Sequence, residues 1–268
     1  MSTLFYVPSN KQPHLTVTSS STLASTSTLT DVLDGNHNTY ISFSNNTGKK
    51  NLDFDFASKT LDGLSSVAVF LNNYDTNYGT GYIGASGSNN GTTWGKLTPH
   101  NSPLTHSGTP NFVVDFSGSA KFRYYRLSFN GLPSTHQIGE VYWLKKLTLP
   151  RNHEVDNSNQ QPVYFNTLTQ LDGGYQYVNY NYANPVQKFT RSYKLITLSE
   201  IQTVEDIYDA CRGTRYPFLY NSGSTIATAH FCRFQDNTPD WSGHAERSYK
   251  ECTLNFNSIP FISSGESI

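Results

Sequence analysis

Three cysteines, Cys211, Cys232 and Cys252, are the side chains of this 268-residue chain best suited to metal or disulfide chemistry, and all lie in its last quarter. An odd number of cysteines in a chain without a secretion signal argues against a disulfide framework. His230 lies close to Cys232, but a metal site normally needs a fourth ligand and often a C-x-x-C pair, which the sequence does not offer. We therefore expect buried free thiols, with a metal site near Cys232 as the alternative.

Two carboxylates, Asp53 and Asp55, alternate along one predicted strand, so they share a face and could mimic a catalytic acid pair. Acids that face solvent from an alternating strand are the ordinary case, and we interpret these two in that way. Residues 79–84 match G-x-G-x-x-G, but no helix opens on them to hold a pyrophosphate. The sequence also contains no P-loop, nucleophile elbow or H-E-x-x-H motif. We therefore predict a protein that is not an enzyme.

The composition favours strands. Aromatic residues make up 14% of the chain, charged residues only 15%, and there is a single methionine. Because Tyr, Phe, Thr and Val suit half-buried pleated surfaces, we predict an all-β fold of two β-sandwich modules. The formal net charge of −1 gives no attraction to nucleic acid or to an anionic membrane. The apolar runs are too short for a transmembrane span and the N-terminus lacks a signal-peptide pattern, so we expect a protein kept in a cytoplasm.

Residues 138–150 divide the chain, because the strand signals change after them. Residues 1–150 form the first predicted module, residues 151–161 a polar linker, and residues 162–268 the second module. In the first module Leu52, Phe54 and Phe56 alternate with polar residues, which places them on one buried strand face. Many short strands with polar turns are typical of a sandwich or a jelly roll.

Four landmarks occur in order along the first module. They are Leu33-Asp34-Gly35-Asn36 followed by Thr39-Tyr40, Ser86 followed by Asn90-Gly91-Thr92-Thr93-Trp94, Phe122-Arg123-Tyr124-Tyr125-Arg126-Leu127, and Ile138-Gly139-Glu140-Val141. With these landmarks the module resembles the discoidin, or coagulation-factor C-type, jelly roll, which carbohydrate-binding modules of many bacterial enzymes share. The resemblance implies that Trp94 occupies a core strand position.

The same resemblance implies a calcium ion beneath the Asp-Gly loop, near the last strand of the module. The positions that match are Asp34, Asn36, Thr39 and Glu140. Calcium takes six to eight oxygen ligands from carboxylates, hydroxyls and backbone carbonyls, which suits this set. The alternative is that Asp34 and Asn36 only form an Asx-turn.

Sugar-binding members of this family use aromatic and amide side chains on loops at one end of the sandwich. Residues 72–78 would be such a loop here, with Asn73, Tyr74 and Tyr78 as the candidate carbohydrate-binding residues. Tyrosine rings stack on sugar rings, and amides form hydrogen bonds with hydroxyl groups. The alternatives are a solvated loop or a loop packed on a neighbouring subunit.

The second module contains the one convincing helix pattern. Its apolar residues recur at spacings of three and four and predict a helix over about residues 200–212. These residues are Ile201, Val204, Ile207, Tyr208 and Cys211. Ser199 and Gln202 form a predicted capping box, and Gly213 is placed to end the helix.

The order of elements in the second module also resembles a family. A Gly-Gly-Tyr turn, a long strand with Arg191 and Tyr193, the single helix and the closing strands are similar to the β-sandwich core of distal-tail and minor tail proteins of long-tailed bacteriophages. The resemblance implies a homo-oligomeric ring that continues the tail tube, with edge strands pairing between chains and with tube, hub and fibre proteins as partners. Such ring proteins often carry a peripheral sugar-binding-like domain.

Two functions therefore compete. The main hypothesis is a structural virion protein, a ring-forming distal-tail or tail-tip subunit that links the tail tube to host-recognition parts. It would be assembled in the bacterial cytoplasm and located in the virion tail, with a host-surface glycan as a further partner. The alternative is a free-standing carbohydrate-binding module or lectin. Neither hypothesis requires a cofactor, apart from the candidate calcium ion.

Overall fold

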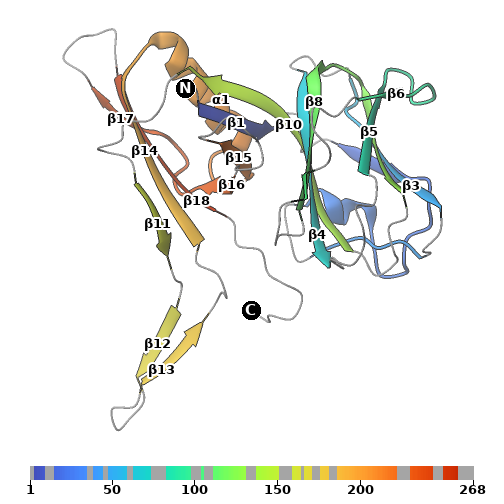
Figure 1. Cartoon of the computed structure of the whole chain (residues 1–268), viewed down its shortest axis with the longest axis horizontal. Coiled ribbons are helices and arrows are strands. Elements are labelled where there is room, and N and C mark those ends of the chain that lie inside the picture. Colours follow the sequence, from blue (N-terminus) through green and yellow to red (C-terminus); the bar gives the residue numbers. More distant parts are fainter. Residues whose placement is uncertain are drawn as a thin grey trace. The chain divides into compact units, whose positions relative to one another are not determined.

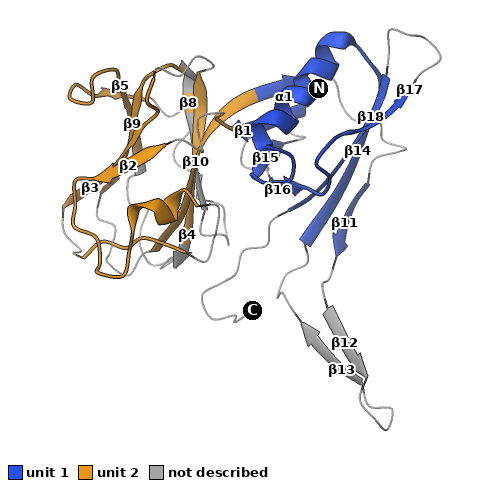
Figure 2. Cartoon of the chain, turned by 180° about the vertical axis from the view of Figure 1, so that it is seen from behind, with its two compact units in different colours: residues 1–7, 147–268 blue, residues 8–146 orange. Residues whose placement is uncertain are grey.

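A computed structural model gives the architecture of the chain (Figure 1). It describes residues 3–9, 15–34, 39–44, 48–58, 63–73, 83–97, 104–105, 111–130, 137–150, 159–163, 166–170, 176–180, 186–221, 230–243 and 250–258. The chain divides into two compact units (Figure 2). Unit 1 comprises Met1–Val7 and Leu147–Ile268, and unit 2 comprises Pro8–Lys146. The described residues form strands and one α-helix, which confirms the all-β fold class.

Unit 2 contains two groups of antiparallel strands. One is a five-stranded sheet in the order β2 (Thr16–Ser19), β3 (Lys49–Asp55), β9 (Tyr124–Asn130), β5 (Ile83–Ser88) and β6 (Gly95–Lys96). The other runs in the order β10 (Gln137–Leu149), β4 (Leu64–Asn73), β8 (Asn111–Ala120) and β7 (Leu104–Thr105). A 3-10 turn, η2 (Leu29–Val32), leads toward the predicted calcium loop.

The core of unit 2 lies between the facing sides of these strands. Leu52 and Phe54 are fully buried and Phe56 is 1% exposed, which confirms the alternation predicted for β3. The ring of Trp143 on β10 lies 4.9 Å from that of Tyr125 on β9 and 5.5 Å from that of Phe54, centroid to centroid. Alternating apolar residues on strands of both groups therefore meet in one core.

Most strands of unit 1 pair in one antiparallel series, which we call the sheet of unit 1. Its order is β11 (Asn159–Val163), β14 (Val186–Ile196), β18 (Lys250–Ser258), β16 (His230–Phe234), β15 (Phe218–Asn221) and β1 (Thr3–Pro8), and β17 (Asp240–Gly243) also pairs with β18. The last residues of β10, from Leu147, belong to this unit. Two further strands, β12 (Asn166–Gln170) and β13 (Gln176–Tyr180), pair only with each other among the described residues.

Helix α1 (Leu198–Cys211) packs its predicted apolar stripe on the sheet of unit 1. The Tyr208 ring stacks on that of Phe234 at 4.0 Å between centroids. The predicted capping box was wrong by two residues, because Thr197 is the N-cap and Glu200 occupies the third position of the helix. A Glu200 carboxylate oxygen accepts hydrogen bonds from the Thr197 N–H at 2.8 Å and from its hydroxyl at 2.7 Å. A carboxylate can accept both bonds, whereas the amide of Gln202 lies too far along the helix to reach them.

The first strand of the chain belongs to unit 1, although the sequence analysis placed it in the module of residues 1–150. On β1, Phe5 is fully buried and its ring lies 5.8 Å from that of Phe218 and 5.5 Å from that of Tyr220. The chain thus begins unit 1, forms unit 2, and returns to complete unit 1 from Leu147 onward. Unit 2 is therefore an insertion within unit 1.

Within the described residues, no helix has the length and apolar character that crossing a membrane requires.

Candidate functional site

Both strand groups of unit 2 meet the predicted calcium loop at one end of the unit. Ile41 exchanges two backbone hydrogen bonds of 2.8 Å with Ile138 near the start of β10. Two residues later, the ring of Phe43 lies 6.4 Å from that of Phe129 near the end of β9. The segment that follows the calcium loop therefore bridges the end of one strand group and the start of the other.

The loop predicted to bind sugar starts at the same end. Asn73, the last residue of β4, pairs with Gln137, the first residue of β10. The start of β5 pairs with the end of β9 through Ile83 and Phe129. We call this region the loop end of unit 2. It is formed by Asp34, residues 39–43, the end of β4, the start of β5, the end of β9 and the start of β10.

The chain enters and leaves unit 2 at its opposite end. The backbone N–H of Ser9, at the entry, donates a 2.9 Å hydrogen bond to the carbonyl of Trp143. Trp143 lies toward the exit of β10, which leaves the unit after Lys146. The loop end therefore carries neither of the two connections to unit 1.

Three of the predicted calcium ligands lie in the described part of the loop end. The Thr39 hydroxyl donates a 2.8 Å hydrogen bond to an Asp34 carboxylate oxygen, and both residues are at the surface. Glu140 is fully buried. Glu140 lies two residues after Ile138, which pairs with Ile41, and Thr39 lies two residues before Ile41. Asn36 lies outside the described residues.

The loop end offers carboxylate and hydroxyl oxygens, which are the type of ligand atom that a hard cation such as calcium binds. A carboxylate and a hydroxyl, Asp34 and Thr39, lie in direct contact, and a second carboxylate, Glu140, is buried near the start of β10. Within the described residues, no three His, Cys, Asp or Glu side chains gather closely enough to hold a metal ion. A calcium ion here would therefore also need amide and backbone carbonyl oxygens from the loop.

The predicted sugar-binding residues are only partly placed. The backbone of Asn73 lies at the loop end, as described above. Tyr74, the next residue, and Tyr78, five residues after Asn73, lie outside the described residues. The prediction of a carbohydrate site on residues 73–78 therefore stays a prediction.

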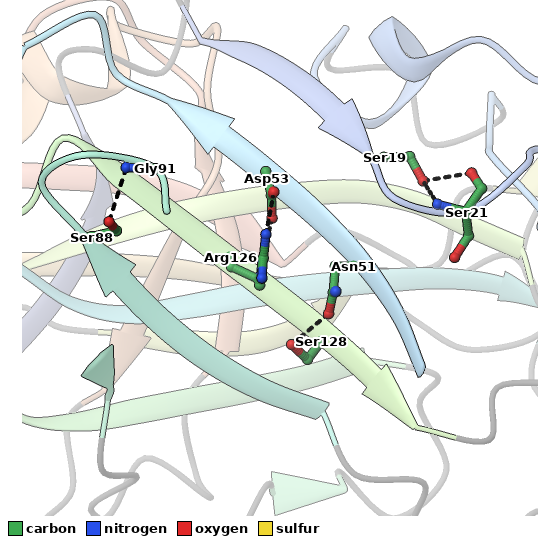
Figure 3. Close-up of polar contacts among 8 residues, drawn as sticks. All are labelled: Ser19, Ser21, Asn51, Asp53, Ser88, Gly91, Arg126 and Ser128. Atoms are coloured by element: carbon green, nitrogen blue, oxygen red, sulfur yellow. Dashed lines mark hydrogen bonds and ion pairs between the residues drawn. The ribbon is translucent and has the colours of Figure 1, made fainter. Parts of the chain in front are cut away.

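The outward face of β3 and β9 carries ion pairs that the sequence did not indicate, and Figure 3 shows the pair of Asp53 and Arg126. Arg126 donates two hydrogen bonds of 2.6 Å to the two carboxylate oxygens of Asp53. In the same way, Arg123 donates two hydrogen bonds of 2.9 Å to Asp55. These bonds lower the pKa of Asp55 against the opposing effect of its partial burial. The two aspartates are thus half-buried partners of arginines, which does not suit a catalytic acid pair.

Trp94 lies on this face and not in the core, so the position implied for it by the family resemblance was wrong. Its ring is half-buried, and the Arg126 guanidinium carbon lies 4.0 Å from the ring centroid. The loop before Trp94 is fixed by its own side chains, because the Asn90 amide oxygen accepts hydrogen bonds from the Thr92 and Thr93 N–H groups at 3.0 and 2.9 Å. The stack of Trp94, Arg126 and Asp53 therefore holds this loop against the sheet.

Replacing Arg126 with alanine is expected to destabilise unit 2 by about 1–2 kcal/mol, because it removes a bidentate ion pair and a cation–π contact that are each worth about 1 kcal/mol when partly exposed. Urea unfolding followed by circular dichroism measures the change. Alanine at Lys121, an exposed cation on the same unit, serves as the control and should change stability little. A loss at Lys121 equal to that at Arg126 would show that the stack contributes nothing specific.

The three cysteines are buried and free, as predicted. Burial raises the pKa of Cys211 and Cys232 well above that of an ordinary thiol, and it raises the pKa of Cys252 to about 12. All three therefore stay protonated at neutral pH and are poor nucleophiles. They pack in the core of unit 1 beside residues such as Phe218 and Phe256.

No family model and no curated protein sequence matches the chain. Solved structures do match about half of it. The module CpGH89CBM32-6 from Clostridium perfringens is 20% identical, with a TM-score of 0.37, and the match covers 49% of this chain and 93% of that one. The family 32 carbohydrate-binding module of C. perfringens NanJ, solved with galactose, is 14% identical, with a TM-score of 0.42 and coverage of 53% and 99%. The lectin domain of lectinolysin, complexed with Lewis B antigen, is 17% identical, with a TM-score of 0.39 and coverage of 51% and 96%. A likeness of this extent transfers no function, so the function of this chain has to rest on its own residues.

Proposed function

We propose that unit 2 is a carbohydrate-binding module whose site is the loop end, and that the chain acts by binding rather than by catalysis. The observation that carries this proposal is that the described residues flanking two separately predicted loops lie at one end of the unit. The pairing of Ile41 with Ile138 brings in the oxygen-rich loop, and the pairing of Asn73 with Gln137 brings in the start of the Asn- and Tyr-rich loop. Loops gathered at one end of a rigid sheet framework are a common place for ligand binding.

The chemistry of the second loop suits a neutral sugar. Tyr74 and Tyr78 offer aromatic faces that can cover the apolar side of a pyranose ring, and the amide of Asn73 offers both a donor and an acceptor for hydroxyl groups. We further propose that Asp34, Asn36, Thr39 and Glu140 hold a calcium ion that fixes the neighbouring loop. Calcium would then stabilise the site without contacting the sugar.

A panel of immobilised neutral glycans, probed with the full chain, tests the proposal. Alanine at Tyr74 or Tyr78 is expected to weaken binding at least about tenfold, because aromatic anchors at the centre of a site carry much of its binding energy. Alanine at Tyr124, a half-buried tyrosine on the outward face of β9, is the matched control and should leave binding unchanged. A chain that is folded but binds no glycan on the panel would contradict the proposal.

Chelation tests the calcium proposal separately. Adding EDTA to the purified chain should lower the melting temperature of unit 2, and restoring calcium should bring it back. Asp34→Ala should abolish this response. An identical melting temperature with EDTA and with excess calcium would exclude a calcium ion that stabilises the loop.

A second candidate is the structural subunit of a phage tail, which the division of the chain into two compact units favours. The family resemblance implies a tail ring protein that carries a peripheral sugar-binding-like domain, and unit 2 is a separate unit beside the helix-backed sheet strands of unit 1. Native mass spectrometry distinguishes the two candidates. Closed rings of the full chain would support a tail subunit, whereas a monomer that binds glycan would support a free-standing module.

A further inference from the structure

Strand β11 lies at the edge of the sheet of unit 1 and is weakly covered. Within the described residues it pairs only with β14. Four of its five residues, Asn159 to Pro162, are exposed although every one of them is paired. Neighbouring side chains therefore contribute little to holding this strand, and its position depends on backbone pairing and on a few polar contacts.

The side-chain contacts that join β11 to β14 come from one buried guanidinium. Arg191 on β14 is only 4% exposed. One of its terminal nitrogens donates to the Asn159 backbone carbonyl at 2.6 Å, and the other donates to the Gln160 side-chain oxygen at 3.3 Å. Its Nε donates to the Tyr220 hydroxyl at 2.8 Å, which fixes the guanidinium from the core side. Arg191 thus joins the first two residues of β11 to the core of unit 1.

The backbone directions of the two strands follow from one further bond. The Gln187 N–H donates to the Ser258 hydroxyl at 2.8 Å, so it faces β18 and not β11. The N–H and C=O groups of successive residues point to opposite sides of a strand, so those of residues 186, 188 and 190 point toward β11. These residues pair with residues 163, 161 and 159 of β11. The backbone groups of the residues between them, Gln160 and Pro162, therefore point away from β14. Pro162 has no N–H to offer, so the outer edge of β11 is a poor template for another strand. The edge of β14 that β11 covers contains no proline, so each of its residues has an N–H to donate.

We propose that β11 can detach from the edge of β14 and that Arg191 is the positioning residue that holds it in place. The edge of β14 that is then exposed pairs with the β11 strand of a second copy of this chain. The second copy is the occupant because β11 is the segment whose register on β14 is known, from Asn159 opposite Thr190 to Val163 opposite Val186. The connection before β11, residues 150–158, could span about 30 Å when extended, and the connection after it, residues 164–185, contains the paired strands β12 and β13. The inference concerns unit 1 and is independent of glycan binding.

Hydrogen exchange of the full chain tests the role of Arg191. Arg191→Met is expected to speed amide exchange in peptides covering β11 and β14 at least about tenfold, because it removes charged hydrogen bonds to β11. Gln160→Glu should slow it, since the guanidinium would then face a carboxylate. Lys188→Met, at a cation on the same strand, is the matched control and should leave exchange unchanged. If Arg191→Met does not fold, Gln160→Ala removes a single acceptor and should speed exchange in the same peptides.

Oligomeric state tests the occupant. A second copy's β11 in the same register makes the same contacts with Arg191, so Arg191→Met should speed the conversion between monomer and dimer, and Gln160→Glu should slow it. Size exclusion with light scattering follows this conversion over time after dilution. Two differently tagged copies should form mixed dimers in which β11 and β14 are both protected from exchange. A folded Arg191→Met chain that exchanges at the parent rate, or that stays monomeric at every concentration, overturns the proposal. So does a dimer that protects β14 while β11 exchanges freely, because another segment then occupies the edge.

Discussion

Replacing Phe5 with alanine is expected to destabilise the C-terminal half of the protein by about 3–5 kcal/mol, although the residue lies at the N-terminus. The side chain is fully buried in the core of unit 1, and its ring contacts those of Phe218 and Tyr220. Truncation leaves a cavity between the strands that carry those rings. Hydrogen exchange measured by peptide should show faster exchange across residues 186–258 and unchanged exchange across residues 48–58 and 124–130.

Two further substitutions, one at Phe5 and one at the adjacent residue, serve as controls. Phe5→Leu keeps most of the apolar volume and should cost much less than Phe5→Ala. Leu4→Ala changes the adjacent residue, which is half-buried and points to the other face of the strand, and it should also cost less. A Phe5→Ala chain that loses protection in unit 2 while unit 1 keeps its own would show that β1 does not belong to unit 1.

Local patterns made part of the fold predictable from the sequence. On β3 the alternation of Leu52, Phe54 and Phe56 with polar residues has period two, and only one face of that strand can be buried. In α1 the spacing of Val204 and Ile207 fixes the buried face in the same way. Where one short period decides which side chains enter a core, the sequence is sufficient.

The position of β1 was not predictable, because it depends on a pairing between distant parts of the chain. Leu4, Phe5 and Tyr6 pair with residues 219–221 of β15, more than two hundred residues later. A short apolar strand at an N-terminus gives no signal that names its partner. The first strand was therefore assigned to the module that follows it directly, and that inference had only proximity in sequence behind it.

The ion pairs of the outward sheet face escaped prediction for a related reason. Asp53 and Arg126 face one another because β3 and β9 pair in a particular register, and that register is set by the core on the other face of the sheet. A paired aspartate and an exposed aspartate give the same pattern in the sequence. The partner of Trp94 was hidden in the same way, although the Asn90 turn before it was recognisable.

The candidate loop end shows the same division between local and distant information. The sequence alone indicated that Asp34 and Thr39 belong to one polar loop, and they are in direct contact. That Ile41, which follows this loop, and Asn73, which precedes the other, lie at one end of unit 2 required the pairings of β10 with β4 and with Ile41. Proximity of two loops is a property of the sheet and not of either loop.

Replacing Trp143 with alanine is expected to unfold unit 2 in preference to unit 1, with a loss of about 3–5 kcal/mol. Its side chain is fully buried, and its ring contacts those of Phe54 and Tyr125 across the two strand groups and that of Phe116 on β8. No other side chain can fill the space that truncation leaves without moving both strand groups. Urea unfolding should show a lower midpoint for the transition assigned to unit 2 by hydrogen exchange.

The proposed glycan binding gives this substitution a functional readout, because the loop end depends on the strands that Trp143 holds together. Under conditions in which Trp143→Ala is partly unfolded, the apparent affinity should fall by the folded fraction, while the affinity of the remaining folded molecules stays unchanged. Trp143→Phe fills part of the space and should recover most of the stability and all of the binding. Removing a ring from the centre of a packed core is expected to lower the free energy of unfolding. A Trp143→Ala chain whose unit 2 keeps full protection from exchange would contradict this prediction and show that other contacts hold the two strand groups together.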